Sequence, residues 1–230
     1  MAMKLNTKFN YPKSIRAYYN GQRLYDINSE KLPSVTTILN ATKSEEQKAS
    51  LERWRQKVGA KEADQISRQA LNRGSIMHEY LEKFLLGKLN LDLLGDNSIE
   101  RQMADQIIEN GLRNHVSEVW GVESTLYYPK KYAGATDLLC ILDGKETVVD
   151  FKNSSKPRKD EWNHDYYLQL GAYSLAHNFV YGTNINQGVI LLCTKDLMFQ
   201  RFIIDSEKLK DYQNKFLERV EMYYNMKLND

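Results

Sequence analysis

The chain has 230 residues, 42% apolar and 27% charged, which is enough for one well-packed domain. Its net charge of +2 excludes a basic field over the whole surface, so contact with nucleic acid would require local basic patches. No apolar segment approaches the length of a membrane span and no signal-peptide core is present, which predicts a soluble intracellular protein without membrane partners.

The N-terminal stretch is basic, because no acidic residue precedes Asp26. A transit peptide could have this composition, but the turn signal Asn20-Gly21 between two tyrosine-rich runs favours a hairpin of the mature domain. Cys140 and Cys193 both lie in apolar runs, where a small buried thiol is expected. Mitochondrial targeting and a disulfide framework are therefore not expected.

Two capped helices follow the hairpin. Residues 33–39 predict a short helix with Ser34 as its cap, and Ser44 opens a second helix with Gln47 completing a capping box. An apolar stripe on the second helix lies among basic residues: the stripe is Leu51, Trp54 and Val58, and the basic residues are Lys48, Arg53, Arg55 and Lys57. The pattern fits an ordinary amphipathic helix or a wall that contacts phosphates.

Three further helical segments are predicted, at residues 60–71, 74–86 and 97–120. His78, in the second of them, shares a face with apolar and acidic residues. A histidine in that setting is either a hydrogen-bonded structural residue or a ligand.

From Glu123 the pattern changes to strands, predicted at residues 123–128, 132–142 and 146–153. Asp143-Gly144 between the last two has the chemistry of a tight hairpin turn. Basic residues then cluster in a polar loop that either contacts a nucleic-acid backbone or is solvated: Lys156, Arg158 and Lys159.

Three charged side chains meet on this hairpin: Asp137, Asp150 and Lys152. Because side chains alternate along a strand, Asp150 and Lys152 point to the same side of the sheet. Two carboxylates and an amine can bind a hard divalent cation and orient a water, which is equipment for phosphodiester hydrolysis. The alternative is a solvated salt bridge, but the neighbouring apolar runs predict burial, where unpaired carboxylates are costly.

A helix is predicted at residues 162–180, followed by strands at 188–194 and 198–205 and a final amphipathic helix. The first of these helices carries two apolar stripes, which indicates packing on more than one side: Trp162, Tyr166, Tyr173 and Val180 in one, and Leu168, Ala172, Leu175 and Phe179 in the other. Gln169 interrupts the first stripe and needs polar partners. The element order predicts an α/β fold with a central mixed sheet.

Five features in order give the chain a family resemblance: His78 on a helix, Glu123, Asp137 in Gly-x-x-Asp, Asp150-x-Lys152, and Gln169-x-x-x-Tyr173. Their order and spacing resemble the RecB-like branch of the PD-(D/E)XK nucleases. Within that branch, the runs at residues 33–39, 51–56 and 74–82 are similar to the family of the mitochondrial genome maintenance exonuclease and its phage and bacterial relatives.

The resemblance implies a restriction-endonuclease-like core, with a central mixed sheet flanked by helices and an N-terminal helical arch or subdomain. Residues 1–230 would form a single nuclease domain. Within it, residues 1–120 would be the N-terminal hairpin and helical region, and residues 121–230 the catalytic α/β core.

The family's site roles follow by analogy. Mg²⁺ or Mn²⁺ would be held by His78, Asp137, Asp150 and the Phe151 carbonyl. Lys152 would position or activate the attacking water, Glu123 would complete the site, and Gln169 and Tyr173 would orient site groups or substrate. Contacts to the DNA strand are predicted for Arg53, Trp54, Arg55, Lys156 and Arg158.

Some features of relatives are missing from the sequence. Two cysteines are too few for the iron-sulfur cluster that some relatives carry. No Gly-x-x-x-x-Gly-Lys-Ser/Thr motif occurs, so no ATP-driven motor is expected.

The leading hypothesis is a metal-dependent exonuclease that acts on single-stranded DNA with a free end, in replication, repair or recombination, in the cytoplasm of a bacterial or phage-infected cell. One alternative is a structure-specific or restriction-type endonuclease on the same core. Another is a catalytically inactive DNA-binding module.

Overall fold

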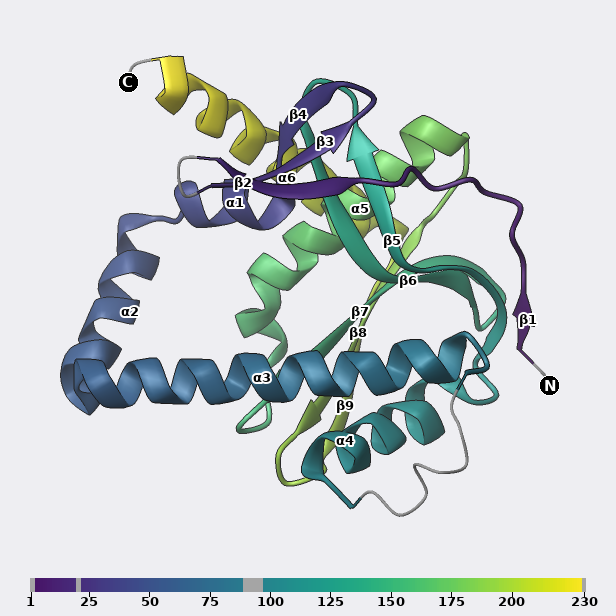
Figure 1. Ribbon diagram of the computed structural model, residues 1–230, viewed down its shortest axis with the longest axis horizontal. Helices are drawn as coiled ribbons and strands as arrows, with labels where there is room; N and C mark the ends of the chain where they lie inside the picture. The colour runs from purple at the N-terminus through teal and green to yellow at the C-terminus, as the bar shows by residue number, and fades with distance from the viewer. Residues whose placement is uncertain (1–2, 20–21, 89–96, 229–230) are drawn as a thin grey trace.

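A computed structural model describes residues 3–19, 22–88 and 97–228 (Figure 1). Within them, a six-stranded sheet has the order β1-β5-β6-β7-β8-β9. The strands are β1 (Lys4–Leu5), β5 (Val116–Tyr128), β6 (Tyr132–Leu142), β7 (Lys145–Ser154), β8 (Gln187–Thr194) and β9 (Phe199–Ile204). β5, β6 and β7 form an antiparallel meander, whereas β7 and β8 run parallel. The predicted mixed sheet and its meander are confirmed.

Helices cover both faces of this sheet. They are α1 (Val35–Ala41), α3 (Ala60–Leu85), α4 (Ile99–Ile107), α5 (His164–Tyr181) and α6 (Ser206–Leu228). Leu138 and Val149 join α3 and α4 in one hydrophobic core, whereas their neighbours Leu139 and Val148 join α1, α5 and α6 in another. This alternation is the period-two pattern of a strand with apolar residues on both faces. The described chain therefore has a sheet between two helical layers.

The predicted turn between β6 and β7 is present. Asp143 and Gly144 have φ of 50° and 79°, and Leu142 pairs with Lys145 across them. Two positive φ values are the signature of the two-residue type I′ turn, which Asp-Gly favours. The turn fixes which residue of β6 lies opposite which residue of β7.

A second, three-stranded sheet near the N-terminus contains β2 (Ile15–Tyr19), β3 (Gln22–Ile27) and β4 (Glu30–Pro33). β2 and β3 pair antiparallel, as the predicted hairpin requires, although Asn20 and Gly21 themselves lie outside the described residues. Tyr25 of β3 packs with Ala133 of β6, which places this small sheet beside the central one.

Both predicted N-terminal caps are confirmed. Ser34 accepts a hydrogen bond from the Thr37 amide at the start of α1. Ser44 and Gln47 form a reciprocal capping box at the start of α2 (Glu45–Val58). Unlike α1, α2 buries no residue, so its apolar stripe does not enter either core. Gly59, at a φ of 86°, turns the chain directly from α2 into α3.

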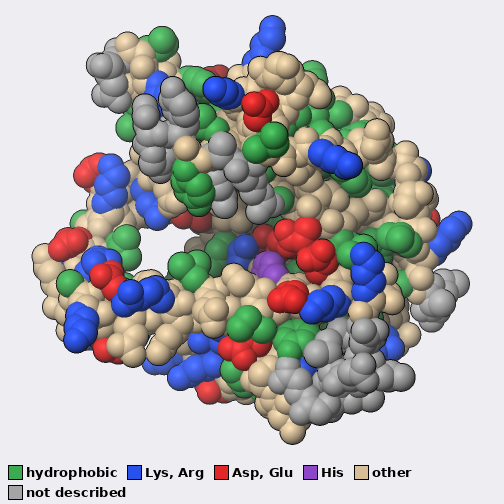
Figure 2. All heavy atoms as spheres, viewed as in Figure 1, with side chains coloured by type: hydrophobic (Ala, Val, Ile, Leu, Met, Phe, Trp, Pro, Cys, Tyr) green, Lys and Arg blue, Asp and Glu red, His purple; other side chains and the backbone are tan. Residues whose placement is uncertain are grey.

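The arm built by α2 stands away from the sheet, and α3 returns across the molecule (Figure 1). Figure 2 shows an opening through the molecule on the side where α2 stands, next to a hollow in which a histidine is surrounded by acidic side chains. The described residues form no helix long and apolar enough to cross a membrane.

The predicted helix at residues 97–120 is wrong from residue 113 onward. Helical structure ends with the π-helical turn η2 (Ile108–Leu112), and β5 begins at Val116. Irregularities in the pairing of β5 with β6, between Val116 and Glu118 and between Val119 and Gly121, disturb the alternation of a strand. The resulting apolar spacing imitates a helix, so periodicity alone misassigned these residues.

The predicted helix at residues 162–180 begins as a 3₁₀ turn, η3 (Asp160–Asn163), and continues as α5. Two residues of its predicted apolar stripes are not packed inside: Trp162 is 53% exposed and Phe179 is 57% exposed. They lie at the two ends of the helical segment, where Phe179 packs on Tyr128 of β5 at a ring-centroid distance of 4.4 Å.

Candidate active site

A cavity of about 210 Å³ lies where α3, α5 and three strands of the central sheet meet. Its lining contains seven residues singled out from the sequence: His78, Glu123, Asp137, Asp150, Lys152, Gln169 and Tyr173. Three further residues, Tyr25, Thr36 and Ala135, complete the lining. The seven predicted residues alone come from five separate elements: α3, β5, β6, β7 and α5.

The cavity opens where β6 and β7 separate. Their ladder runs from the Leu142–Lys145 pair to the Leu138–Val149 pair and ends there. Beyond that point, the Phe151 amide donates a 2.6 Å hydrogen bond to Asp137 Oδ2 instead of to a strand carbonyl. An unpaired buried amide is costly, so this carboxylate satisfies the backbone at the point where the strands part. Its other oxygen remains directed toward His78.

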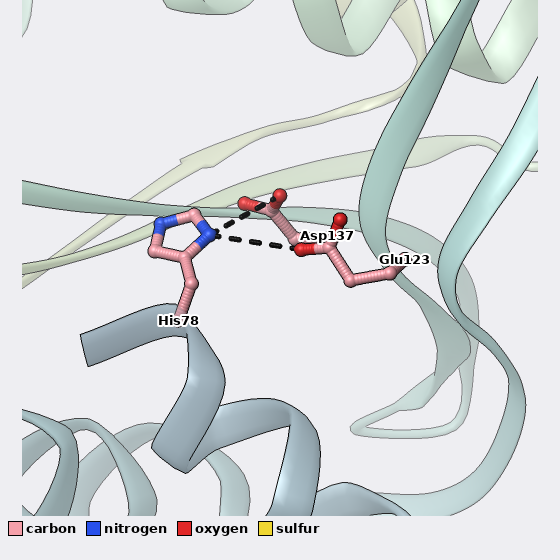
Figure 3. A group of neighbouring side chains, drawn as sticks. All are labelled: His78, Glu123 and Asp137. Carbon is pink, nitrogen blue, oxygen red and sulfur yellow. Dashed lines mark ion pairs between the residues drawn. The ribbon is translucent and has the colours of Figure 1, made fainter. Parts of the chain in front are cut away.

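His78 joins α3 to this strand end. Its Nε2 lies 3.0 Å from the Phe151 carbonyl oxygen, and its Nδ1 lies 3.6 Å from Asp137 Oδ1 and 3.8 Å from Glu123 Oε1 (Figure 3). Burial lowers the pKa of His78, but the charge of Asp137 and the Glu123 carboxylate outweigh it, so the pKa is raised overall. The site thus attracts positive charge to the space between these three side chains.

Glu123 has an unusual backbone conformation. Its φ is 47°, in the left-handed region that a residue with a side chain rarely adopts, and it follows the irregular pairing of β5. Strained residues of this kind persist where the surrounding structure determines them, and they cluster at functional sites. Here the distorted strand directs the Glu123 carboxylate toward His78 (Figure 3).

Asp150 and Lys152 form a buried pair. Lys152 Nζ lies 2.5 Å from Asp150 Oδ2, and the Asp150 side chain is 5% exposed. Burial raises the pKa of Asp150 despite the opposing charge of Lys152, and Asp137 raises it further. Burial lowers the pKa of Lys152, but Asp150 and Asp137 outweigh that effect, and the net shift is upward. The lysine is therefore held as an ammonium group.

Gln169 and Tyr173 approach from α5. Gln169 Oε1 lies 3.5 Å from Lys152 Nζ, so the glutamine that interrupts the apolar stripe finds its polar partner in the site. Tyr173 is 5% exposed and lies against β6, where a Cβ added to Gly134 would stand 2.8 Å from the tyrosine ring. Glycine at this position lets the ring approach the strand.

Three groups could hold a metal ion. His78, Glu123 and Asp137 each offer one ligand atom, and these atoms lie within 4.8 Å of one another. Carboxylate oxygens with one imidazole suit Mg²⁺ or Mn²⁺. Asp150 is a further carboxylate of the same cavity, with its Oδ2 paired with Lys152 Nζ. The donor set therefore fits a divalent cation.

The residues predicted to contact nucleic acid lie outside this cavity. Arg53, Trp54 and Arg55 are on α2, where Arg55 forms a 2.9 Å ion pair with Asp64 of α3. Lys156 is exposed in the loop after β7. Arg158 fastens this loop: its Nε donates a 2.9 Å hydrogen bond to Asn163 Oδ1.

A larger cavity of about 860 Å³ adjoins the site between α3 and the end of β7. Four residues of the site also line this cavity: His78, Glu123, Phe151 and Lys152. Small residues of α3 form much of its other wall. The site is therefore continuous with a groove that leads along α3.

Sequence reasoning missed Tyr25, Thr36 and Tyr166. Tyr25 and Thr36 line the cavity, and the Tyr166 ring centroid lies 4.9 Å from Lys152 Nζ. Thr36 lies in the run at residues 33–39 that resembles a nuclease family, and this resemblance is a signal in the sequence that could have identified it. No local pattern indicated that the first hairpin would pack beside residues more than a hundred positions away.

Comparison with curated proteins gives three relatives of one kind. The chain is 28% identical over 207 residues to human mitochondrial genome maintenance exonuclease 1, and 29% identical over 206 residues to the Mus musculus protein. The chain resembles an exonuclease. Both matches cover 86% of this chain, which spans 60% of the length of each relative. No protein-family model matches the chain.

Solved structures give partial superpositions. A crystal structure of an exonuclease candidate from Eubacterium rectale has 16% identity and a TM-score of 0.46, covering 68% of this chain and 66% of that one. An alkaline exonuclease from Laribacter hongkongensis has 13% identity and a TM-score of 0.26, covering 66% of this chain and 84% of that one. These superpositions are too partial to assign a fold family.

Proposed function

We propose that this protein is a metal-dependent nuclease with a PD-(D/E)XK type of core, hydrolysing phosphodiester bonds in DNA. The observation that carries the proposal is the convergence of His78, Glu123 and Asp137 beside the buried Asp150–Lys152 pair. The similarity to mitochondrial genome maintenance exonuclease 1 supports the same class of chemistry.

Mg²⁺ or Mn²⁺ would be held by His78, Glu123 and Asp137, with Asp150 at the inner wall of the cavity. When bound, the ion supplies a Lewis acid that makes water a better nucleophile and offsets negative charge on the phosphate. The Phe151 carbonyl lies close to His78 Nε2 and can orient that ring, and it stays a proposed ligand of the ion.

Lys152 acts on the substrate side of the same space. Asp150 and Gln169 fix its ammonium group from two elements, so it needs little reorganisation to hydrogen-bond the attacking water or a phosphate oxygen. A preorganised positive charge of this kind stabilises the negative charge that develops on the phosphate during hydrolysis.

The opening beside α2 favours a single strand with a free end as the substrate. It lies next to the hollow that contains acidic groups and a histidine (Figure 2), and the groove along α3 leads to Lys152. An end must enter first if the strand passes through the opening. We therefore propose exonuclease action on single-stranded DNA.

The test uses end-labelled single-stranded and double-stranded DNA and closed circular single strands, each with Mg²⁺, with Mn²⁺ or with chelator, resolved by product size. The proposal expects metal-dependent digestion of linear single strands and intact circles. Equal digestion of circles would favour an endonuclease on the same core. Binding without cleavage under every metal condition would favour an inactive DNA-binding module.

A further inference from the structure

An aromatic and basic strip follows β7 and leads away from the site. It consists of Trp162 in η3, Tyr166 in the first turn of α5, and the cations Arg158 and Lys159. None of the four lines the cavity that contains the metal-ligand candidates. The strip is nevertheless in contact with the site, because Tyr166 touches Lys152.

Tyr166 lies between two cations. Its ring centroid is 4.9 Å from Lys152 Nζ and 4.9 Å from Arg158 Cζ. Its side chain is only partly buried, and its hydroxyl makes no hydrogen bond to the described residues. A tyrosine needed only for packing would be expected to bury its ring and satisfy its hydroxyl. The Tyr166 ring packs against the hydrophobic core with part of its surface and also borders Lys152, the proposed catalytic lysine.

Hydrogen bonds hold the backbone at Trp162 in place while its indole ring faces solvent. Arg158 donates hydrogen bonds to the Trp162 carbonyl oxygen and, at 2.9 Å, to Asn163 Oδ1. The indole is 53% exposed, and Lys159 Nζ lies 5.7 Å from its ring centroid. The backbone is therefore held while the ring remains available.

The charges around the strip favour an anionic occupant. Asp160 is already engaged by the Tyr167 hydroxyl and by Lys208 Nζ at 3.1 Å, and Glu161 lies 3.8 Å from Lys159 as an exposed pair. Glu161 therefore offsets the charge of Lys159, whereas Arg158 forms no ion pair with the described residues and adds positive charge beside the Tyr166 ring. Flat aromatic surfaces flanked by cations are the features that bind bases and phosphates of a single strand.

We propose that Trp162 forms a nucleobase-stacking subsite for the strand whose phosphate lies at Lys152, with Tyr166 and Arg158 linking this ring to the site. The inference rests on the proposed nuclease function and names where the adjoining nucleotides bind. Stacking on the Trp162 indole needs no hydrogen bonds to base edges, so the subsite accepts any base. Arg158 and Lys159 lie where they can face the backbone of the same nucleotides.

Binding is measured by fluorescence anisotropy of a labelled dT oligonucleotide, with chelator present so that no cleavage occurs. Trp162→Ala is expected to raise Kd at least about fivefold, the lower end of the effect of losing one stacked base. Phe179→Ala is the matched control, because Phe179 is similarly exposed at the other end of α5. That variant is expected to keep the wild-type Kd.

A second measurement separates stacking from a structural effect. A single abasic residue is moved along the oligonucleotide, and wild-type protein is expected to show weakened binding at one position. Trp162→Ala should lose that position-specific penalty while melting at the wild-type temperature. An unchanged Kd in Trp162→Ala, or no sensitive position in wild-type protein that does cleave DNA, overturns the subsite and leaves the nuclease proposal standing. Wild-type protein that neither binds nor cleaves single strands overturns both.

Discussion

At the scale of single residues, the site depends on one lysine that is held as a cation by buried carboxylates. Lys152→Ala removes the ammonium group while leaving His78, Glu123 and Asp137 in place. We expect cleavage to fall by at least about 10²- to 10³-fold, the usual loss when one preorganised charge-stabilising group is removed. Steady-state digestion of labelled single-stranded DNA measures this effect.

Metal and DNA binding by Lys152→Ala should remain close to wild type, which calorimetry and anisotropy can check. Lys195→Ala is the control, because Lys195 is exposed in the turn between β8 and β9. Turnover by Lys152→Ala at the wild-type rate would show that the catalytic lysine is assigned wrongly.

His78 supplies the nitrogen that faces two carboxylates, at 3.6 Å and 3.8 Å. His78→Ala should raise the half-saturating Mn²⁺ concentration by about tenfold or more, because even outer-shell substitutions cost that much in metal affinity. Isothermal titration with Mn²⁺ gives the value. His115→Ala, at the far end of the sheet, is the control, and an unchanged Mn²⁺ affinity in His78→Ala would return His78 to a structural role.

Residue chemistry was the most predictable part of the site. Asp137, Asp150 and Lys152 could be placed together from strand alternation and one Asp-Gly turn, since both rules are local. Thr36 and Tyr166 could not be placed in this way, because their roles depend on where α1 and α5 pack against β6 and β7. That packing is decided by contacts far apart in sequence.

At the scale of elements, α5 and α6 approach unusually closely. A Cβ added to Gly171 would lie 2.8 Å from the backbone carbonyl of Tyr212. The backbone of α6 cannot rotate out of the way as a side chain can, so Gly171→Ala should lower the free energy of unfolding by about 1–3 kcal/mol. This loss should occur even though, at an exposed helix position, alanine stabilises the helix by about 1 kcal/mol relative to glycine.

Urea unfolding of Gly171→Ala gives the measurement. Lys57→Ala, on the unburied helix α2, is the control and should stay within about 0.5 kcal/mol of wild type. A Gly171→Ala protein as stable as wild type would mean that the two helices can separate without loss.

Element prediction succeeded at the serine caps and at the Asp-Gly turn and failed at the start of β5. Ser34 and Ser44 fixed the starts of α1 and α2 correctly. Asn114, with a φ of 67°, ends the helical segment before β5, but the irregular pairing near Val116 and Val119 gave a helical spacing to the strand residues that follow. The boundary is set by pairing with β6, which a local pattern does not contain.

At the scale of the whole molecule, the N-terminal segment is tied to α5 through a buried histidine. His177 Nε2 lies 3.1 Å from the Tyr11 hydroxyl, and its Nδ1 lies 2.7 Å from Thr183 Oγ1. Burial lowers the pKa of His177 to about 4, with a smaller contribution from Lys8. The folded protein therefore keeps this ring neutral at pH values where the unfolded chain binds a proton.

Stability should consequently depend on pH in one direction. Well above pH 6.5, His177 is neutral in both the folded and the unfolded protein, so its full contribution to the free energy of unfolding is present. As pH falls from about 6.5 to about 4, only the unfolded state gains the proton, and up to about 3 kcal/mol is lost at about 1.4 kcal/mol per pH unit.

Urea unfolding at several pH values across this window tests the expectation. His177→Gln should show a slope smaller by up to about 1.4 kcal/mol per pH unit than wild type. Parallel slopes for the two proteins would assign the acid sensitivity to other groups.

The arm formed by α2 has a topological consequence. Because α1 is anchored to α6 by Arg219, which donates a 3.0 Å hydrogen bond to the Leu39 carbonyl, and α3 is anchored at the strand end by His78, the arm closes a loop of chain. A polymer that passes through this closed loop could leave it only by one of its own ends. Cutting the peptide backbone within α2 would release it sideways, with every residue around His78 still intact.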